Sequence, residues 1–458
     1  MPQLEGIQAL FFSTCILLVF LLLGKLVRVK TPLLQKLFLP SSIIGGFIAL
    51  AFGPFGFNLI PDWATAAWVK FPGILINVVF ATLFLGVTMP KAKQIWSLGG
   101  SQLCYGALVG VGQYFVALIT LALFIKPFFD VPDIFACIVE IGFSGGHGTA
   151  AGMTPVLEEL GFAAGGALAQ MSATIGLITA VVGGIIMVNI GIRKGYCASI
   201  RPDQGLSKNK QTGLIPHNER YSIATATVAS EAIEPLALHA GVVGVAILVG
   251  WAMLLWIQAM FPSIKGFPLF PLAMIGGMFV QSACNKVGMS QYFDRGTFER
   301  LLGISLDVLV LSAVATLKLD LFVQNIGPFA IIMATGIAWP VFATLVLAPR
   351  MFPKFWFERG ITEFGMQTGV TAIGLLLLRL VDPGYRTGTA DAFGFKQMVY
   401  EPFLGGGLIT AMAPALIIAF GIWPTVLICG AIMIVCVIIA ALNGWINLHP
   451  NRQATPLE

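Results

Sequence analysis

The stretch Glu140–Thr154 reads EIGFSGGHGTAAGMT and lies inside a largely apolar part of the chain. Its glycines are Gly142, Gly145, Gly146, Gly148 and Gly152. Because each glycine costs an uninterrupted helix about 1 kcal/mol relative to alanine, a helix is expected to break here. Inside a membrane, irregular backbone is tolerated only where it is buried in protein or lines a wet cavity. The stretch therefore predicts a broken membrane segment rather than a continuous span.

The composition of the whole chain places most of it in lipid. The 458 residues are 57% hydrophobic and 10% charged, whereas a soluble domain carries about 25% charged residues. The net charge of +5 comes from basic residues in short gaps between apolar segments, which indicates membrane topology and not nucleic-acid binding. The seven cysteines form no CxxC pair, so neither a disulfide framework nor a metal cluster is predicted.

About eleven segments are long and apolar enough to cross a bilayer, which takes about 20 residues as a helix. The first is expected to be retained and not cleaved as a signal, because its basic residues follow the apolar run. Two further stretches are too short or too broken to cross, and we predict that they form re-entrant hairpins: Ile134–Leu160 and Ile361–Leu380. The predicted spans are Ala9–Leu26, Pro40–Ile60, Pro72–Met89, Gly99–Ile125, Ala163–Ile192, His239–Phe261, Pro268–Cys284, Leu301–Leu317, Ile326–Ala348, Met398–Phe420 and Pro424–Leu442.

The distribution of lysine and arginine predicts the orientation of these spans. When the loops are assigned alternately to two sides, nearly all basic residues fall on the side that holds the loop after the first span. The other side holds only Lys70, Lys126, Lys265 and Lys318. Cytoplasmic loops carry the excess of positive charge, so we predict an external N-terminus and a multi-pass protein of the cell membrane, the inner membrane in a bacterium.

The long polar stretch 193–236 predicts a cytoplasmic linker between two similar halves, 1–192 and 237–420. Each half opens its second span with a related motif, PSSIIGGF from Pro40 and PLAMIGGMF from Pro271, and each has a later broken segment. Five spans are expected in each half, and an odd number makes the two halves opposite in orientation. The sequence thus predicts an all-α membrane protein of two inverted five-helix repeats, each with a re-entrant hairpin, and an extra helix and tail at 421–458.

The first hairpin is predicted to enter from outside and to turn near Gly145–Gly148, where glycines let a ligand approach the backbone. Ser144 and Thr149 add hydroxyl oxygens, which suit Na⁺, and half-helix N-termini favour a substrate carboxylate. An ionisable side chain within a membrane usually has a functional role, so we also predict that His147 belongs to the site. The alternative is a glycine-rich stretch that only allows close helix packing.

The second broken stretch reads TEFGMQTGVTAIG from Thr362 and supplies oxygens from Glu363, Gln367, Thr368 and Thr371. It is expected to enter from the cytoplasm, so that the two hairpins meet near the middle of the membrane. The predicted substrate-binding residues are Ser144, Gly145, Gly146, His147, Gly148, Thr149, Gln367, Thr368 and Thr371. The candidates for cation binding are Ser144, Thr149, Asp307 and Thr371, where Asp307 is a carboxylate inside an apolar run that is either cation-linked or structural.

The string SGGHGTA from Ser144, the second FG(x)₅TAIG segment from Phe364 and the run from Gly303 to Leu319 resemble the bacterial sodium/glutamate symporter family. The resemblance follows the chain in order over nearly its whole length. It implies Na⁺ coupling, a homodimer, and a transport domain that carries both hairpins and moves against a scaffold. The second hairpin departs from the family pattern at Met366–Val370, and Leu375 stands where an asparagine is usual, so glutamate is the less secure part of the resemblance.

The sequence therefore predicts a secondary transporter that couples Na⁺ to glutamate or a related small carboxylate or amino acid, with no cofactor and no metal beyond transported sodium. A proton-coupled transporter or exporter is the nearest alternative, because Asp307, Glu140 and His147 can all titrate. A channel would call for a charged ring or a repeated filter motif. A membrane enzyme would call for paired catalytic groups or a metal motif, which the sequence lacks, so no enzyme is expected.

Overall fold

The structure is a computed structural model that describes residues 6–36, 39–54, 56–87, 92–198, 214–215, 217, 220–260, 268–317, 319–448 and 450. Every regular element within these residues is helical. The chain divides into two compact units, each of which draws on both predicted halves. Unit 1 comprises Met1–Met89, Ala151–Glu159 and Ser207–Leu319, and unit 2 comprises Pro90–Ala150, Leu160–Leu206 and Asp320–Glu458.

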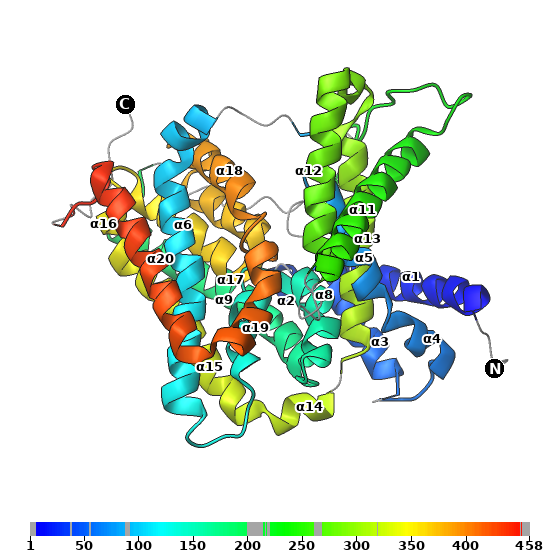
Figure 1. Cartoon of the computed structure of the whole chain (residues 1–458), viewed down its shortest axis with the longest axis horizontal. Helices are drawn as coiled ribbons and strands as arrows, with labels where there is room; N and C mark the ends of the chain where they lie inside the picture. Colours follow the sequence, from blue (N-terminus) through cyan, green and yellow to red (C-terminus); the bar gives the residue numbers. More distant parts are fainter. Residues whose placement is uncertain are drawn as a thin grey trace. The chain divides into compact units, whose positions relative to one another are not determined.

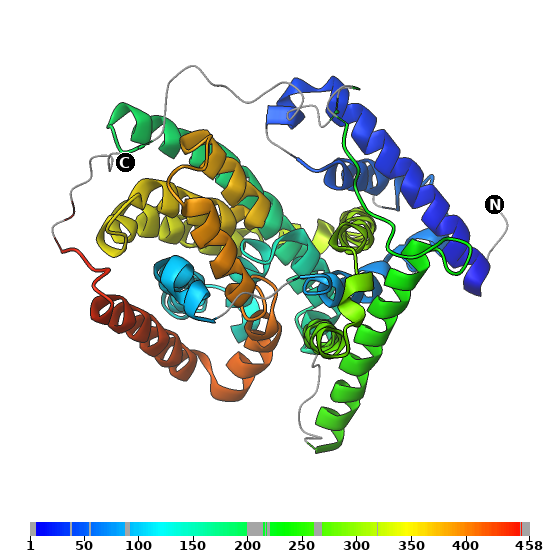
Figure 2. The same cartoon turned by 90° about the horizontal axis from the view of Figure 1, so that it is seen from above.

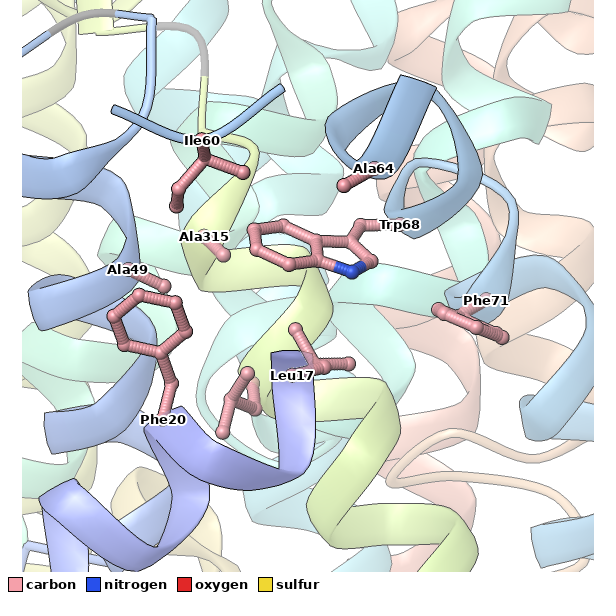
Figure 3. Close-up of a cluster of buried hydrophobic side chains, with 9 residues drawn as sticks. Leu17, Phe20, Ala49, Ile60, Ala64, Trp68, Phe71 and Ala315 are labelled. Carbon is pink, nitrogen blue, oxygen red and sulfur yellow. The ribbon is translucent and has the colours of Figure 1, made fainter. Parts of the chain in front are cut away.

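Unit 1 is built mainly from two sets of three helices, one from each predicted half. An apolar cluster forms where the first set and α13 meet, with the Trp68 ring beside Phe20 and Ile60 (Figure 3). The Trp68 indole N–H donates to the carbonyl of Ser13 at 2.9 Å, so its polar edge is satisfied. The helices of this unit are α1 (Gly6–Lys30), α2 (Pro32–Lys36), α3 (Ser41–Phe52), α4 (Asp62–Trp68), α5 (Phe71–Thr82), α11 (Pro235–Met260), α12 (Leu269–Val287), a 3₁₀ turn (Met289–Tyr292) and α13 (Arg295–Ala315).

The two IGG motifs make equivalent contacts in unit 1. A Cβ atom on Gly45 of α3 would overlap the Phe20 carbonyl of α1, and one on Gly276 of α12 would overlap the Ala246 carbonyl of α11. The next glycine of each motif contacts the third helix of the other set. Gly46 faces the Val314 side chain of α13, and Gly277 faces the Ala81 carbonyl of α5. Small residues let helix backbones approach this closely. Three helix pairs of unit 1 have a counterpart in the other set: α1 with α3 and α11 with α12, α3 with α13 and α12 with α5, and α1 with α13 and α11 with α5.

Unit 2 contains two long helices that each end in a π turn and lead into a broken segment. These are α6 (Ala92–Thr120) with Leu121–Ile125, and α15 (Ile326–Phe342) with Ala343–Leu347. In Figures 1 and 2, α20, drawn in red, lies along α6, and the two helices are in contact. The other helices are a 3₁₀ turn (Asp133–Cys137), α7 (Ile138–Gly142), α9 (Gly165–Arg193), α16 (Ala348–Met351), α17 (Trp356–Val381), α18 (Thr389–Tyr400), α19 (Leu408–Phe420) and α20 (Ile422–Leu442). The division between the units falls within α8 (Gly146–Glu159) and α14 (Leu319–Gln324).

Within the described residues, 8 helices are, by length and composition alone, apolar enough to cross a membrane, against about eleven expected. One of the 8, Trp356–Val381, covers the second predicted hairpin and not a predicted span. The helices that cover the predicted spans Pro40–Ile60, Pro268–Cys284 and Leu301–Leu317 are not among them, and α3 already ends at Phe52. The 8 segments are Gly6–Lys30, Asp62–Thr82, Ile95–Ile125, Gly165–Arg193, Pro235–Met260, Ile326–Met351, Trp356–Val381 and Ile422–Leu442.

The predicted tenth span, Met398–Phe420, is wrong as a continuous helix. The helix α18 ends at Tyr400, residues 401–407 are irregular, and α19 begins at Leu408. Gly405 and Gly406 adopt φ angles of 74° and 107°, which favour glycine because it has no side chain to clash. The triple glycine Gly405–Gly407, after Pro402, was the sequence signal for this break.

The predicted linker 193–236 falls only partly on described residues. Residues 199–213 lie outside them, including Arg201, Lys208 and Lys210. From residue 220 onward the chain is irregular until α11 begins at Pro235, and Thr227 bonds to the Tyr292 carbonyl at 2.7 Å within unit 1. The cytoplasmic position of this linker stays a prediction.

Candidate functional site

The first broken segment leaves and re-enters the same part of unit 2. The helix α7 ends at Gly142, and α8 begins at Gly146, which has a φ of 68°. The rings of Phe135 and Phe162, which bracket the segment, lie 5.8 Å apart. Because a helix rises about 1.5 Å per residue, a straight segment would carry these two rings far apart. The chain therefore folds back on itself between them.

The second broken segment is a helical hairpin. Although α17 runs from Trp356 to Val381, its backbone is not helical at Gly369 and Val370. A Cβ atom on Gly365 would lie 2.9 Å from the Cα of Gly374, whereas nine residues of continuous helix would separate them by about 13.5 Å. The two halves of α17 thus pack against each other, with the turn at Gly369–Val370, inside the stretch predicted from sequence.

The tips of the two broken segments lie against each other. A Cβ atom on Gly146 would overlap Cγ1 of Val370. Gly146 can take this position because its left-handed backbone carries no side chain. Val370 also has a positive φ, 71°, which a β-branched residue adopts only when its surroundings hold it there. The meeting point of the tips is therefore a closely packed and strained place in unit 2.

Tyr400 of α18 joins the two segments by hydrogen bonds. Its hydroxyl accepts from Nε2 of Gln367 at 2.9 Å and lies 3.5 Å from Oγ of Ser144. Gln113 of α6 donates to the main-chain oxygen of Gln367 at 2.6 Å. A Cβ atom on Gly110 would overlap the Tyr400 hydroxyl. Gly110 of α6, which the sequence places in an ordinary apolar span, thus makes room for this connection.

A buried ion pair lies next to this connection. Lys396 Nζ is 2.7 Å from Glu363 Oε1, and the two side chains are 0% and 1% exposed. Gln367 donates to the same carboxylate oxygen at 2.9 Å, and Gln102 of α6 donates to the other at 2.9 Å. The ammonium also lies 3.6 Å from the centre of the Tyr400 ring. The sequence prediction that counted Lys396 among basic loop residues is wrong.

Thr371, just past the second tip, bonds to α18 and the irregular residues after it. Its hydroxyl donates to Glu401 Oε1 at 2.9 Å and accepts from Gln397 Nε2 at 2.6 Å. Gln397 Oε1 in turn accepts from Lys396 Nζ at 2.7 Å. A single network of hydrogen bonds therefore runs from Thr371 through Gln397 and Lys396 to both tips.

A second buried carboxylate, Glu140, ties the first segment to the break between α18 and α19. It accepts from the Tyr114 hydroxyl at 2.6 Å, the Gly405 N–H at 2.8 Å and the Thr410 hydroxyl at 2.9 Å. Glu140 is 0% exposed, and among the residues that the structure describes no Lys, Arg or His pairs with it. A buried carboxylate with hydrogen-bond donors but no cation is suited to bind a proton or a cation.

Other predicted residues of the first segment make their contacts outside the network. The His147 ring lies 3.0 Å from the Thr174 hydroxyl of α9, and its carbonyl accepts from Gln170. Thr149 is buried and packs against Gly145. Gly145 donates its N–H to the Glu140 carbonyl, and Gly148 lies in the first turn of α8. His147 is thus a bonded partner of α9 in this structure.

The remaining predictions divide between the two units. The Thr368 hydroxyl donates to the Phe364 carbonyl of its own helix at 2.6 Å. Asp307 lies in α13 of unit 1, where its carboxyl interacts with the Ser42 hydroxyl. The structure brings together Ser144, Gly146, Gln367 and Thr371. Sequence reasoning missed Gln102, Gln113, Lys396, Gln397 and Tyr400 as members of the network.

Comparison with known protein families identifies the family of this chain. The family model for the sodium/glutamate symporter matches residues 7–355, which is more than half of the chain. This chain belongs to the sodium/glutamate symporter family. No curated protein matches it. Family membership, together with the apolar helices, confirms the predicted resemblance and makes the protein a multi-pass membrane transporter rather than a member of an enzyme family.

The matched range includes the first broken segment and ends just before α17. Ser144 and Gly146 therefore lie in the part that this symporter shares with its family model. Glu363, Lys396 and Tyr400 lie beyond the end of the match. The second broken segment and α18 therefore lie outside the matched range.

Proposed function

We propose that this symporter couples Na⁺ to the uptake of glutamate or a related small carboxylate or amino acid, and that both bind at the meeting tips of the two broken segments. The observation that carries the proposal is the hydrogen-bond network that joins Ser144, Tyr400, Gln367 and Thr371 at these tips. Hydroxyl, amide and carboxylate oxygens of this kind suit a hard cation. The N-terminus of α8 at Gly146 presents backbone N–H groups that favour a substrate carboxylate.

The arrangement of unit 2 supports this proposal. It holds both tips, as expected for the transport domain that the family resemblance implies. The equivalent contacts of Gly45 and Gly276 support the inverted repeats, because repeated motifs that pack alike indicate a shared origin of the two halves. Within this proposal Ser144, Gly146, Gln367 and Thr371 are the principal ligands. His147, Thr149 and Thr368 take supporting positions.

Uptake into proteoliposomes tests the coupling ion. We expect a Na⁺ gradient to drive accumulation of labelled glutamate, aspartate or another small carboxylate at fixed pH. Replacing Na⁺ by choline should lower the initial rate by at least tenfold. Equal initial rates in Na⁺ and choline would contradict the proposed coupling.

A proton-coupled symporter or exporter is the second candidate, and Glu140 favours it. A buried carboxylate that accepts three hydrogen bonds and has no cationic partner among the described residues can carry a proton between the two sides. In the same vesicles, a pH gradient without Na⁺ would then drive uptake. Glu140→Gln should abolish this response while it leaves a response to Na⁺.

For the arrangement in the cell membrane we propose an external N-terminus, a cytoplasmic linker and a homodimer. The asymmetry of lysine and arginine supports the orientation, and the family resemblance supports the dimer. A single cysteine introduced at position 208 should react with an impermeant maleimide only after the cells are permeabilised. Labelling of this position in intact cells would reverse the proposed orientation.

A further inference from the structure

The ammonium of Lys396, which pairs with Glu363 in the interior, is surrounded by electron-rich groups. Around the ammonium are Glu363 Oε1 and Gln397 Oε1, each at 2.7 Å, the sulfur of Met366 at 3.6 Å and the face of the Tyr400 ring. Oxygen and sulfur lone pairs and the aromatic face are all electron-rich. Without the lysine side chain, these groups would form a site for a small monovalent cation.

The surrounding structure is shaped around this pair. A Cβ atom on Gly106 of α6 would overlap Cε of Lys396 and would lie 2.8 Å from Oε1 of Glu363. Both charged side chains are buried. Because desolvation of two ions is costly, apolar residues in place of a buried ion pair often stabilise a protein equally well. Stability alone is therefore a weak reason for this pair. Its bonds to Gln367 and Gln397 instead connect it directly to the proposed site.

We propose that the ammonium of Lys396 is a tethered cation, which neutralises Glu363 beside the transport site and takes the place of one freely exchanging monovalent cation. A carboxylate so close to the tips requires a positive charge in every state in which it stays ionised and buried. A lysine on α18 supplies that charge without a cation from solution. The inference rests on the proposed function for the position of the transport site and for the choice of Na⁺ as the probe.

Removal of the lysine should expose a cation site. In Lys396→Met, Glu363 keeps its hydrogen bonds to Gln102 and Gln367 but loses its positive partner. The space vacated by the ammonium is bordered by two oxygens and a ring face. We expect this variant to bind one more Na⁺ per chain than the unaltered protein. The double variant Lys396→Met/Glu363→Gln, which removes both charges, should bind no additional Na⁺.

The experiment uses the full-length purified protein in lipid nanodiscs. Binding of ²²Na⁺ is measured to saturation, and the thermal unfolding midpoint is followed while NaCl replaces choline chloride at constant ionic strength. A ligand that binds only the folded state raises the midpoint with its concentration. Lys396→Met should show a steeper rise with Na⁺ than either the unaltered protein or the double variant. Lys396→Gln, which keeps a polar chain, should behave as Lys396→Met does.

The outcomes separate a tethered cation from a simple structural link. A Lys396→Met protein that folds in Na⁺ but not in choline would support the proposal in its strongest form. Equal Na⁺ binding by the single and double variants would overturn it. So would a single variant that fails to fold in either salt while the double variant folds. Should uptake by the unaltered protein prove independent of Na⁺, the proposed coupling fails, whereas an additional Na⁺ bound by Lys396→Met would still establish the role of the lysine.

Discussion

The two broken segments of unit 2 meet at their tips but keep their shape by different means. The first turns at Gly146, and glycine adopts the φ of 68° without strain. The second turns at Val370, where a β-branched residue has a φ of 71°. Such a conformation costs about 1–3 kcal/mol and persists only where the surroundings impose it. The turn of the first segment is thus intrinsically favourable for its residue, whereas the turn of the second depends on packing and hydrogen bonds from neighbouring residues.

The neighbours of the second tip form the polar network. Gln367 and Thr371 flank Val370 and are bound to Tyr400, Gln397 and Glu401. Among the residues that the structure describes, the side-chain link from the first tip to this network is the long contact of Ser144 with Tyr400. The family match covers the first tip and stops before the second. The two tips therefore differ in how they are held: the first by the backbone freedom of glycine, and the second by hydrogen bonds from neighbouring side chains.

The largest effect is expected for Gly146→Val, which should abolish transport. A valine here would be strained by the positive φ, and its side chain would overlap the atoms of Val370. Gly161→Val is the matched control, because Gly161 has a φ of 86° but nothing within 4 Å of a Cβ atom. Uptake per folded protein in proteoliposomes measures the difference. Equal losses in the two variants would mean that the contact between the tips has no functional weight.

Thr371→Val should lower uptake by about tenfold or more. The substitution keeps the volume but removes a hydroxyl that bonds to a carboxylate, and such hydrogen bonds contribute about 1.5–3 kcal/mol. The control is Thr425→Val in α20, where the hydroxyl donates to the carbonyl of Gly421, the residue just before this helix. Initial rates over a range of substrate and Na⁺ concentrations give the answer. Unchanged kinetics for Thr371→Val would remove this residue from the proposed site.

Val370→Gly should be more stable than Val370→Ala by about 1 kcal/mol or more, because only glycine relieves the positive φ. Alanine usually stabilises a chain relative to glycine, so this order is the reverse of the ordinary one. Thermal unfolding of the purified variants measures it. If Val370→Ala is the more stable variant, the backbone of the second tip is not strained, and the two tips do not differ in backbone strain.

Ser144→Ala should have the smallest effect, about a fivefold rise or less in the substrate concentration for half-maximal uptake. Its hydroxyl is 3.5 Å from Tyr400, and a single neutral hydrogen bond contributes about 1 kcal/mol. Ser312→Ala in unit 1 is the control, since that buried hydroxyl bonds only to the Leu309 carbonyl of its own helix. A loss for Ser144→Ala as large as that for Thr371→Val would contradict this order and would give the two hydroxyls equal weight in the proposed site.

The sequence was most informative where a feature depends on local backbone preference. Glycines marked Glu140–Thr154 as a place where a helix breaks, and a stretch with Gly365, Gly369 and Gly374 contains the second break. The same logic applied to Gly405–Gly407 would have found the third break, which the prediction of a tenth span overlooked. Re-entry of either hairpin into the membrane stays a prediction.

The sequence was least informative about the partners of charged and amide side chains. Lys396 lies within the helix α18, and the count of lysine and arginine placed it only among the basic residues of the predicted cytoplasmic side. Gln102 and Glu363 are far apart along the chain, so no spacing rule connects them. Gly110 belongs to an apolar span in the sequence, and nothing in that pattern shows that its missing side chain leaves room for the Tyr400 hydroxyl.

By itself, the amino-acid sequence determined that this chain is an all-helical membrane transporter of the sodium/glutamate symporter family, since hydropathy, glycine content and family motifs are all properties of short segments. Only the tertiary structure decided that Lys396 neutralises Glu363 and that Tyr400 joins the two tips. Burial of a charge is favourable only when a partner is brought to it by packing. The fold of unit 2 brings Lys396 to Glu363, and no local sequence pattern specifies this pairing.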